Sequence, residues 1–155
     1  MGILTRAVFQ QRWLVLDEAL CYFVVMLVHI LLLTQLVATA MMTGILWLVQ
    51  RVQYPLFLGL NDGHFSKWHD LHSSRITWIV APLMIFELAV SAALVFLNEI
   101  NFWQNISVLF LTCVIWGITF FISVPRHEKL SQNGFDKAVI ISLIRTNWGR
   151  TLAYT

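Results

Sequence analysis

The feature of this sequence that most constrains its fold is a long run without charge, residues 19–50, which contains no Asp, Glu, Lys, Arg or Pro. As an α-helix this run would extend about 48 Å, which exceeds the roughly 30 Å hydrocarbon core of a bilayer. Two crossings with a turn between them would need more than about 40 residues. The run therefore predicts one membrane-spanning helix, with its spanning part near residues 24–51.

Two further stretches have the length and composition of membrane spans. Residues 76–98 are interrupted by one charge, Glu87, and residues 102–125 carry none. The whole chain is 59% hydrophobic and 12% charged, whereas a soluble domain has about 25% charged residues. The sequence therefore predicts an all-α membrane protein, a single helical domain over residues 1–155 with three transmembrane helices.

The two ends of the chain have different patterns from the spans. Residues 1–18 mix both signs of charge with apolar residues, which predicts an amphipathic helix along the membrane surface. Residues 135–155 are helical in pattern, but their uncharged stretch, residues 138–144, is too short to cross a bilayer. We expect a short or incomplete fourth helix that is interfacial or half inserted.

Prolines and turn residues suggest where the helices end. Pro55 is predicted to end the first helix and Pro125 the third, while Pro82 is predicted to open the second helix locally. The sequences Asn-Asp-Gly at residues 61–63 and Ser-Gln-Asn-Gly before residue 135 are turn signals. Between them, residues 65–75 are predicted to form a short interfacial helix before the second span.

Basic residues flank the spans unequally. Six lie in the first and third connections, two precede the first span, and the second connection has none. The positive-inside rule then places the N-terminus outside and the first and third connections in the cytoplasm, as in a bacterial inner membrane. A net charge of +2 without a basic run argues against nucleic-acid binding. The counted residues are Arg51, Lys67, Arg75, Arg126, Lys129 and Lys137 against Arg6 and Arg12.

Glu87 is the strongest single candidate for chemistry within the spans. It lies roughly 18 Å into the second span, where an ionised carboxylate costs about 2.5–3.5 kcal/mol or more. We expect it to point into the bundle, near Thr43, Thr112 or Cys113 at the same depth. It is either a proton-handling or ligand-binding acid, and so a candidate catalytic residue, or a protonated side chain that joins helices by hydrogen bonds.

A group of histidines precedes the second span. His69 and His72 are three residues apart, so on a helix they share a face and are candidate metal ligands. His64, Asp70 and His127 lie at the same predicted membrane boundary and would add ligands. The alternative is that all of these are ordinary polar residues of an interfacial segment. The sequence identifies no cofactor.

The C-terminal segment carries a second candidate site. Asn147 and Arg150 also lie three residues apart on one helix face, and they are predicted to enter the bundle at the boundary where the histidines lie. The planar guanidinium suits a carboxylate, a phosphate or a carbonyl, although Arg150 could instead snorkel to lipid headgroups. The predicted ligand-binding residues are His72, Arg75, His127, Asn147, Arg150 and Thr43.

Three segments of the chain resemble one family: "SVPRHEKL" at residues 123–130, "NWGRTLA" at residues 147–153 and "MTGILWLVQRVQYPLF" at residues 42–57. The resemblance is to the anthrone-oxygenase-like family of small four-helix membrane proteins, most of which have no assigned activity. It implies a four-helix bundle and, where an activity is assigned, oxygenation of a polycyclic aromatic anthrone without a known metal or flavin. The matching residues are Pro125, Asn147, Arg150 and Thr151.

The chain also departs from that family. Arg126 and His127 stand where the family tends to have Leu-Asn, and the family's fourth helix continues further beyond its Arg-Thr pair. The sequence thus leaves two functions open. One is binding of a small apolar or aromatic ligand in an intramembrane cavity, with an oxygenase-like reaction implied by the resemblance. The other is a non-catalytic accessory subunit, whose partners would be other membrane subunits or a second copy.

Overall fold

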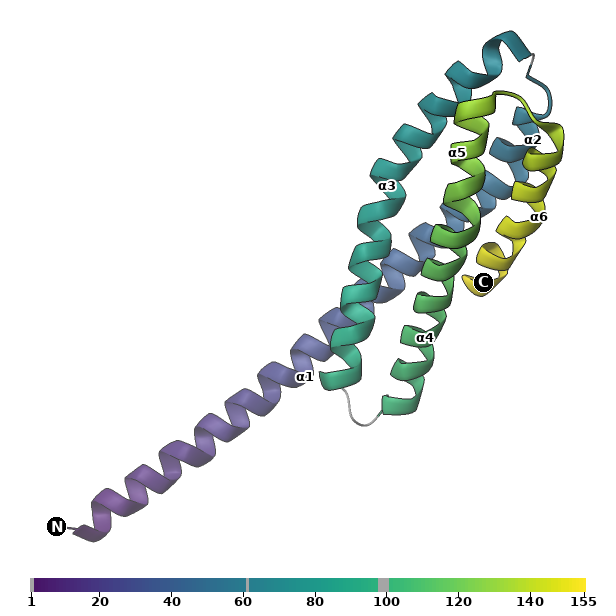
Figure 1. The fold of residues 1–155 in the computed structure, drawn as a ribbon. Coiled ribbons are helices and arrows are strands. Elements are labelled where there is room, and N and C mark those ends of the chain that lie inside the picture. The colour runs from purple at the N-terminus through teal and green to yellow at the C-terminus, as the bar shows by residue number, and fades with distance from the viewer. Residues whose placement is uncertain (1, 61, 98–100) are drawn as a thin grey trace.

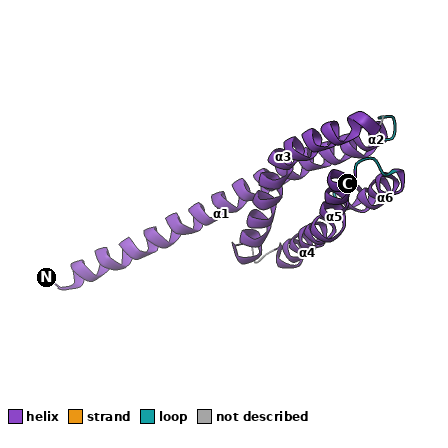
Figure 2. Cartoon of the chain, turned by 45° about the horizontal axis from the view of Figure 1, so that its top comes forward, coloured by secondary structure: helices purple, strands orange, loops and turns teal. Residues whose placement is uncertain are grey.

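The structure is a computed structural model that describes the backbone of residues 2–60, 62–97 and 101–155, and the side chains of residues 18–60, 63–97 and 101–155. Its described residues form helices and short connections, with no strand among them (Figure 2). The elements are α1 (Gly2–Leu48), the π-helical η1 (Val49–Gln53), α2 (Tyr54–Phe57), α3 (Asp62–Leu97), α4 (Phe102–Ile118), the π-helical η3 (Thr119–Ser123), α5 (Val124–Asn133) and α6 (Lys137–Ala153).

These elements make four helices, because α1, η1 and α2 are continuous, as are α4, η3 and α5. The long helix α3 packs against α1 on one side and α4 on the other. The short helix α6 lies against both the first helix and the α4–α5 helix, and it ends well within the length of the bundle (Figure 1). The N-terminal part of α1 extends far beyond the other helices (Figure 1).

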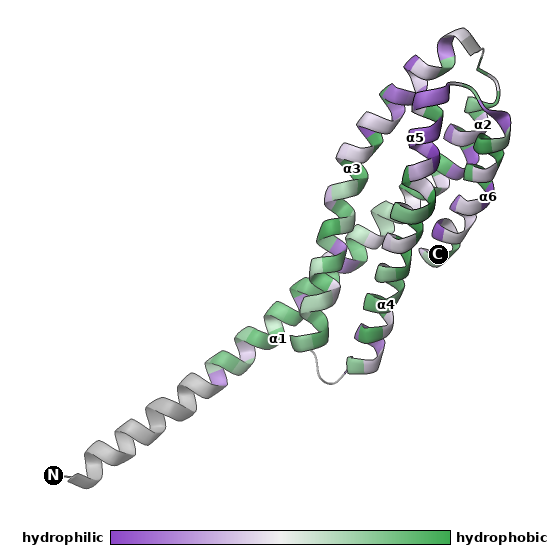
Figure 3. Ribbon diagram, viewed as in Figure 1, coloured by the Kyte–Doolittle hydropathy of each residue, from purple (hydrophilic) through white to green (hydrophobic). Residues whose placement is uncertain are grey.

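Three stretches are long and apolar enough to cross a membrane: Glu18–Phe57, Gly63–Leu97 and Phe102–Asn133. Hydrophilic residues concentrate at the end of the bundle formed by α2, the first turns of α3, α5 and the start of α6 (Figure 3). We call this the polar end. The predicted all-α membrane bundle with three spans and a short fourth helix is confirmed. The chain is an integral membrane helical protein.

The prediction that Pro55 and Pro125 end their helices is wrong. Each proline lies in the first turn of a helical segment that continues, α2 or α5, and each is directly preceded by a π-helical segment, η1 or η3. Proline lacks an N–H and cannot bond to the carbonyl four residues earlier. A wider π turn at the same place lets the chain continue as a helix. Each π segment directly precedes a part of the polar end: η1 precedes α2, and η3 precedes α5.

The helices also extend beyond the apolar runs from which they were predicted. The separate interfacial helix expected at residues 65–75 is instead the first part of α3, and Pro82 lies inside that same helix. The length of an apolar run matches the hydrocarbon core of the membrane, whereas the helix itself can continue with polar residues beyond that core. Residues 2–18 are the first part of α1, but the side chains of residues 1–17, on which the expected amphipathic pattern depends, lie outside the described ones, as does the connection at residues 98–100.

A tight connection sets the start of α6. Gly134 has φ of 78°, a left-handed conformation that glycine adopts without strain, and its N–H bonds to the Leu130 carbonyl at 3.0 Å. Asp136 then caps α6 by accepting hydrogen bonds from the N–H groups of Ala138 at 2.9 Å and Val139 at 3.1 Å. The predicted Ser-Gln-Asn-Gly turn is thus confirmed, and α6 is directed back into the bundle.

Candidate functional site

A cavity of about 430 Å³ lies between all four helices. Most of its wall is apolar, with aliphatic and aromatic side chains from the first helix, α3 and the α4–α5 helix, while α6 contributes Arg150. Polar side chains gather toward the polar end of the bundle. The residues that line it include Tyr54, His72, Ser73, Thr77, Ala81, Trp116, Phe120, His127, Glu128 and Arg150.

Between α3 and the α4–α5 helix, part of the cavity lining is exposed. The lining residues there, Thr77, Phe120 and Val124, are exposed on the surface of the bundle. Phe120 and Val124 belong to a helix that is apolar enough to cross a membrane. A molecule dissolved in the bilayer would therefore have access from the side, without crossing the polar end.

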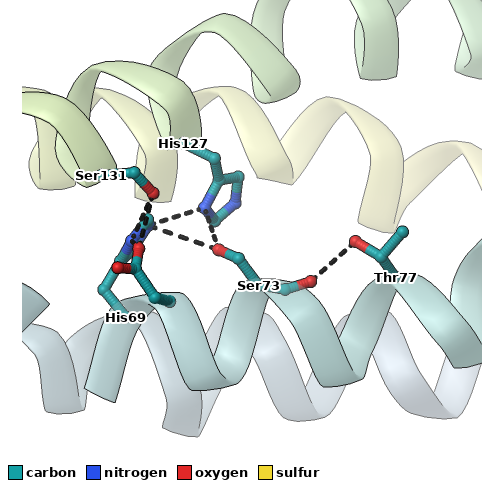
Figure 4. Close-up of polar contacts among 6 residues, drawn as sticks. His69, Ser73, Thr77, His127 and Ser131 are labelled. Carbon is teal, nitrogen blue, oxygen red and sulfur yellow. Dashed lines mark hydrogen bonds and ion pairs between the residues drawn. The ribbon is translucent and has the colours of Figure 1, made fainter. Parts of the chain in front are cut away.

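A chain of hydrogen-bonded side chains connects the surface of the polar end to the cavity. His69, which is fully buried, has Nδ1 at 3.4 Å from the exposed Asp70 carboxylate and Nε2 at 3.0 Å from Nδ1 of His127. Nε2 of His127 lies 3.1 Å from the hydroxyl of Tyr54. Ser73 lies within 3.3 Å of His127, and Ser131 donates to Asp70 at 2.7 Å (Figure 4).

One assignment of protons satisfies every member of this chain. An ionised Asp70 accepts from Nδ1–H of His69, whose Nε2 then accepts from Nδ1–H of His127. Nε2 of His127 in turn accepts from the Tyr54 hydroxyl. In this assignment both imidazoles are neutral with the hydrogen on Nδ1. A proton at Tyr54 would have a continuous path to Asp70 at the surface.

Arg150 lines the same cavity and lacks a partner. Its side chain is 6% exposed, and it lies about 20 Å along α6 from the first turn of that helix. Its Nε is buried without a hydrogen bond. Among the described side chains, none forms a hydrogen bond or an ion pair with the guanidinium. Arg150 is therefore turned inward, as predicted, and not outward toward lipid.

Glu87 is in the opposite situation. It is 1% exposed, and both carboxylate oxygens are bonded: Oε1 accepts from the Thr39 hydroxyl at 3.0 Å and Oε2 from the Tyr154 hydroxyl at 2.7 Å. Ser91 donates to its backbone carbonyl. Glu87 points into the bundle as expected, where its hydrogen bonds join α1, α3 and the C-terminal turn of α6.

The partners predicted for Glu87 were wrong. Thr43 bonds to the backbone carbonyls of Thr39 and Tyr154, at 2.8 and 2.9 Å. Thr112 bonds within its own helix, and Cys113 is exposed. Depth along each helix placed Thr43 one turn from the true partner, Thr39. The sequence had no means to show that Tyr154 would reach Glu87 from the end of α6.

Of the predicted ligand-binding residues, the structure brings three to the cavity and leaves three outside its wall. His72, His127 and Arg150 line it together. Asn147 is 1% exposed and donates instead to the side chain of Gln50 at 2.8 Å. Arg75 is exposed on α3, and Thr43 lies beside Tyr154.

The predicted metal ligands lie on one side of the cavity's polar part. His69 is engaged with His127 and Asp70, while the ring of His72 packs against Phe57 at 5.3 Å between centroids. In the part of the chain that the structure describes, no three His, Cys, Asp or Glu residues are grouped so that they could hold a metal ion. A metal at His69 and His72 stays a prediction from the sequence.

Several residues of this region were not anticipated from the sequence. The hydroxyls of Tyr54 and Tyr154 end the two hydrogen-bonded networks, and Trp116 and Phe120 line the cavity. An available signal was the proline that follows Tyr54 directly, because a proline inside a helix often displaces the turn before it. For Tyr154 the chain offers no comparable signal.

Fold and cavity together define the class: an integral membrane helical bundle with a side-opening internal cavity. Searches with the chain against protein-family models, curated proteins and solved structures find no match.

Proposed function

We propose that the protein binds a small, predominantly apolar or aromatic molecule inside the membrane. The observation that carries this proposal is the cavity of about 430 Å³ with an apolar wall and polar groups gathered at one end. Ligand sites in proteins have this combination of apolar surface with a few convergent polar groups. At about 30 Å³ for each atom-sized unit, the volume admits a ligand of about fourteen heavy atoms.

Filling the cavity tests this proposal. Ala81 lines it, whereas Ala89 lies on the same helix with its side chain exposed. Anthracene, a fluorescent apolar probe, would be added to the protein in nanodiscs of neutral lipid, with energy transfer from tryptophan as the readout. We expect saturable transfer in the wild type and in Ala89→Phe, and its loss in Ala81→Phe. Equal, unsaturable transfer in all three would contradict the proposal.

An oxygenase-like reaction is the finer form of this proposal, and it rests on the family resemblance. The hydrogen-bonded chain from Tyr54 to Asp70 supports it, since removal of a proton from an anthrone ring would need a path to the surface. The oxidant would be dioxygen. Oxygen uptake with anthrone as the substrate, compared between wild type and His127→Phe, tests this form. Uptake that His127→Phe leaves unchanged would contradict it.

A second candidate is an accessory subunit of a larger membrane complex. One observation favours it: the most apolar window of the first span has no buried residue within this chain. A photo-crosslinker at Leu33, exposed on α1, would then give a protein adduct of defined size, while one at the exposed Phe121 on η3 would not. Adducts only with lipid at both positions would count against a subunit.

We further propose that the polar end faces the cytoplasm of a bacterial cell and the N-terminus the outside. The unequal count of basic residues supports this orientation. Ser66 is exposed at the polar end. With Cys21 and Cys113 changed to serine, Ser66→Cys provides a single cysteine for labelling. Labelling of that cysteine by an impermeant maleimide in intact cells would reverse the orientation.

A further inference from the structure

The guanidinium of Arg150 is a buried charge without compensation. At 6% exposure it has left water, and its Nε has no acceptor. A charged group in an apolar interior is costly unless an opposite charge or several hydrogen bonds accompany it. Since the side chain borders the cavity, the missing acceptor can be supplied from there.

Two acids of this part of the bundle, Glu87 and Glu128, are already engaged. Glu87 uses both oxygens for Thr39 and Tyr154, and it forms no ion pair with Arg150. Glu128 borders the cavity but is exposed, and its Oε1 accepts from Gln132 at 3.2 Å. The protein itself therefore offers no counter-ion to Arg150 among the described side chains.

The cavity that Arg150 lines also offers a hydrogen-bond donor that has no protein partner, the ring of His72. His72 and His127 both line it, with ring centroids 6.3 Å apart. The ring of His72 has aromatic contacts but forms no hydrogen bond with another described residue, so its N–H is free for a ligand. A planar guanidinium and an imidazole N–H that line one cavity suit the oxygen atoms of one anionic group.

We propose that Arg150 is the counter-ion for the anionic oxygen head group of a single-chain amphiphile, a carboxylate or a phosphate monoester, whose apolar chain fills the rest of the cavity. This inference rests on the proposed function, because it assigns the ligand class of the same cavity. The head group lies against Arg150 and His72. The chain extends along the apolar wall past Trp116 toward the side opening at Phe120, where it reaches the bilayer.

The volume and the opening select the single chain. About fourteen heavy atoms fit within about 430 Å³, which matches a twelve-carbon acid and leaves no room inside the cavity for a second chain. The exposed Phe120 and Val124 at the opening are apolar, so a longer chain can continue into the membrane.

The test compares three ligands of equal chain length: dodecanoate, dodecyl phosphate and dodecanol. Saturable binding of each would be measured with the full chain in phosphatidylcholine nanodiscs at neutral pH, with empty nanodiscs as the background. The variants are Arg150→Gln and, as a matched control, Arg145→Gln, an exposed arginine on the same helix that does not line the cavity. Dodecanol binding to Arg150→Gln shows that this variant is folded.

We expect the wild type and Arg145→Gln to bind an anionic ligand about ten- to a hundred-fold more tightly than dodecanol, as for a hydrogen bond to a charged group. Arg150→Gln should bind all three about equally. If dodecyl phosphate binds more tightly than dodecanoate, the head group is a phosphate monoester held by the same guanidinium.

Two results overturn the inference while leaving the proposed function intact. One is equal binding of anionic and neutral ligands by the wild type, and the other is a preference for anions that survives in Arg150→Gln. Failure of every ligand to bind saturably, together with anthracene transfer that Ala81→Phe leaves unchanged, would instead remove the proposed function. If Arg150→Gln does not fold, Arg150→Lys replaces it. Lysine keeps the positive charge but lacks the planar pair of N–H donors of the guanidinium. Undiminished binding of the anion by Arg150→Lys would contradict the bidentate contact.

Discussion

Two buried ionisable side chains, Glu87 and Arg150, have opposite surroundings within one bundle. Glu87 has a bonded partner for each oxygen. Arg150 borders a cavity and has none among the described side chains. The two are connected through α6, because Tyr154, the partner of Glu87, lies one helical turn beyond Arg150.

This difference distinguishes polar groups that stabilise the fold from polar groups that are available to bind a ligand. A polar group whose hydrogen bonds are complete stabilises the fold and offers little to a ligand, whereas one left incomplete at a cavity lowers stability and is available for binding. By this criterion Glu87, the stronger candidate in the sequence, holds helices together. Arg150 is the group to which a ligand would bind.

The largest expected effect is on Glu87. Replacing Glu87 by Leu leaves the half-buried hydroxyls of Thr39 and Tyr154 without their acceptor, so we expect a loss of about 3 kcal/mol in the free energy of unfolding. Glu87→Gln retains an acceptor and a similar shape, and it should cost less than about 1 kcal/mol. Thermal unfolding in neutral detergent measures both. A Leu variant as stable as the wild type would show that the hydrogen bonds of Glu87 do not stabilise the fold, and the contrast with Arg150 would then fail.

The second expected effect has the opposite sign. In ligand-free protein, exchanged thoroughly into neutral detergent, Arg150→Met removes an unpaired buried charge and keeps the apolar stem. We expect the free energy of unfolding to increase by about 2 kcal/mol. The control Arg145→Met, at an exposed position, should change it by less than about 0.5 kcal/mol. Destabilisation by Arg150→Met would mean that its charge is balanced within the protein.

The comparison also shows what the sequence could and could not predict. The spans, the fourth helix and the inward direction of Glu87 follow from the membrane's intolerance of charge, which acts on each helix by itself. The partners of Glu87 did not follow. They depend on how far α6 travels into the bundle, and that is set by the cap at Asp136 and by packing between distant segments.

The cavity could not be predicted from the sequence for a related reason. His72, His127 and Arg150 were predicted to meet at one boundary, and they do line one cavity. Trp116 and Phe120 line the cavity from α4 and η3, and each of the π-helical segments η1 and η3 lies just before a proline, Pro55 or Pro125. The same prolines were interpreted as helix ends, because a sequence does not distinguish a break from a wider turn.

A third prediction concerns the residue that links the two regions. Tyr154→Phe removes the hydroxyl that donates to Glu87 at 2.7 Å and leaves the ring in place. We expect a loss of about 1–1.5 kcal/mol in the free energy of unfolding. In the background of Glu87→Leu the same change should cost nothing, since the acceptor is already absent. Additive losses in the double variant would show that the hydroxyl bonds elsewhere.

The smallest expected effect is at Thr43, which was predicted to bind ligand and which the structure places beside the end of α6. Its hydroxyl bonds to the Tyr154 carbonyl as well as to its own helix, while the hydroxyl of Thr34 bonds only to its own helix, at the Leu31 carbonyl. Thr43→Val should therefore lower the free energy of unfolding by about 0.5–1 kcal/mol more than Thr34→Val. Because Thr43 fixes the turn of α6 and does not line the cavity, the preference of the protein for dodecanoate over dodecanol should persist in Thr43→Val. Loss of that preference with unchanged stability would show that Thr43 contributes to ligand binding although its hydroxyl is already hydrogen-bonded, which would contradict the distinction between bonded and unbonded polar groups.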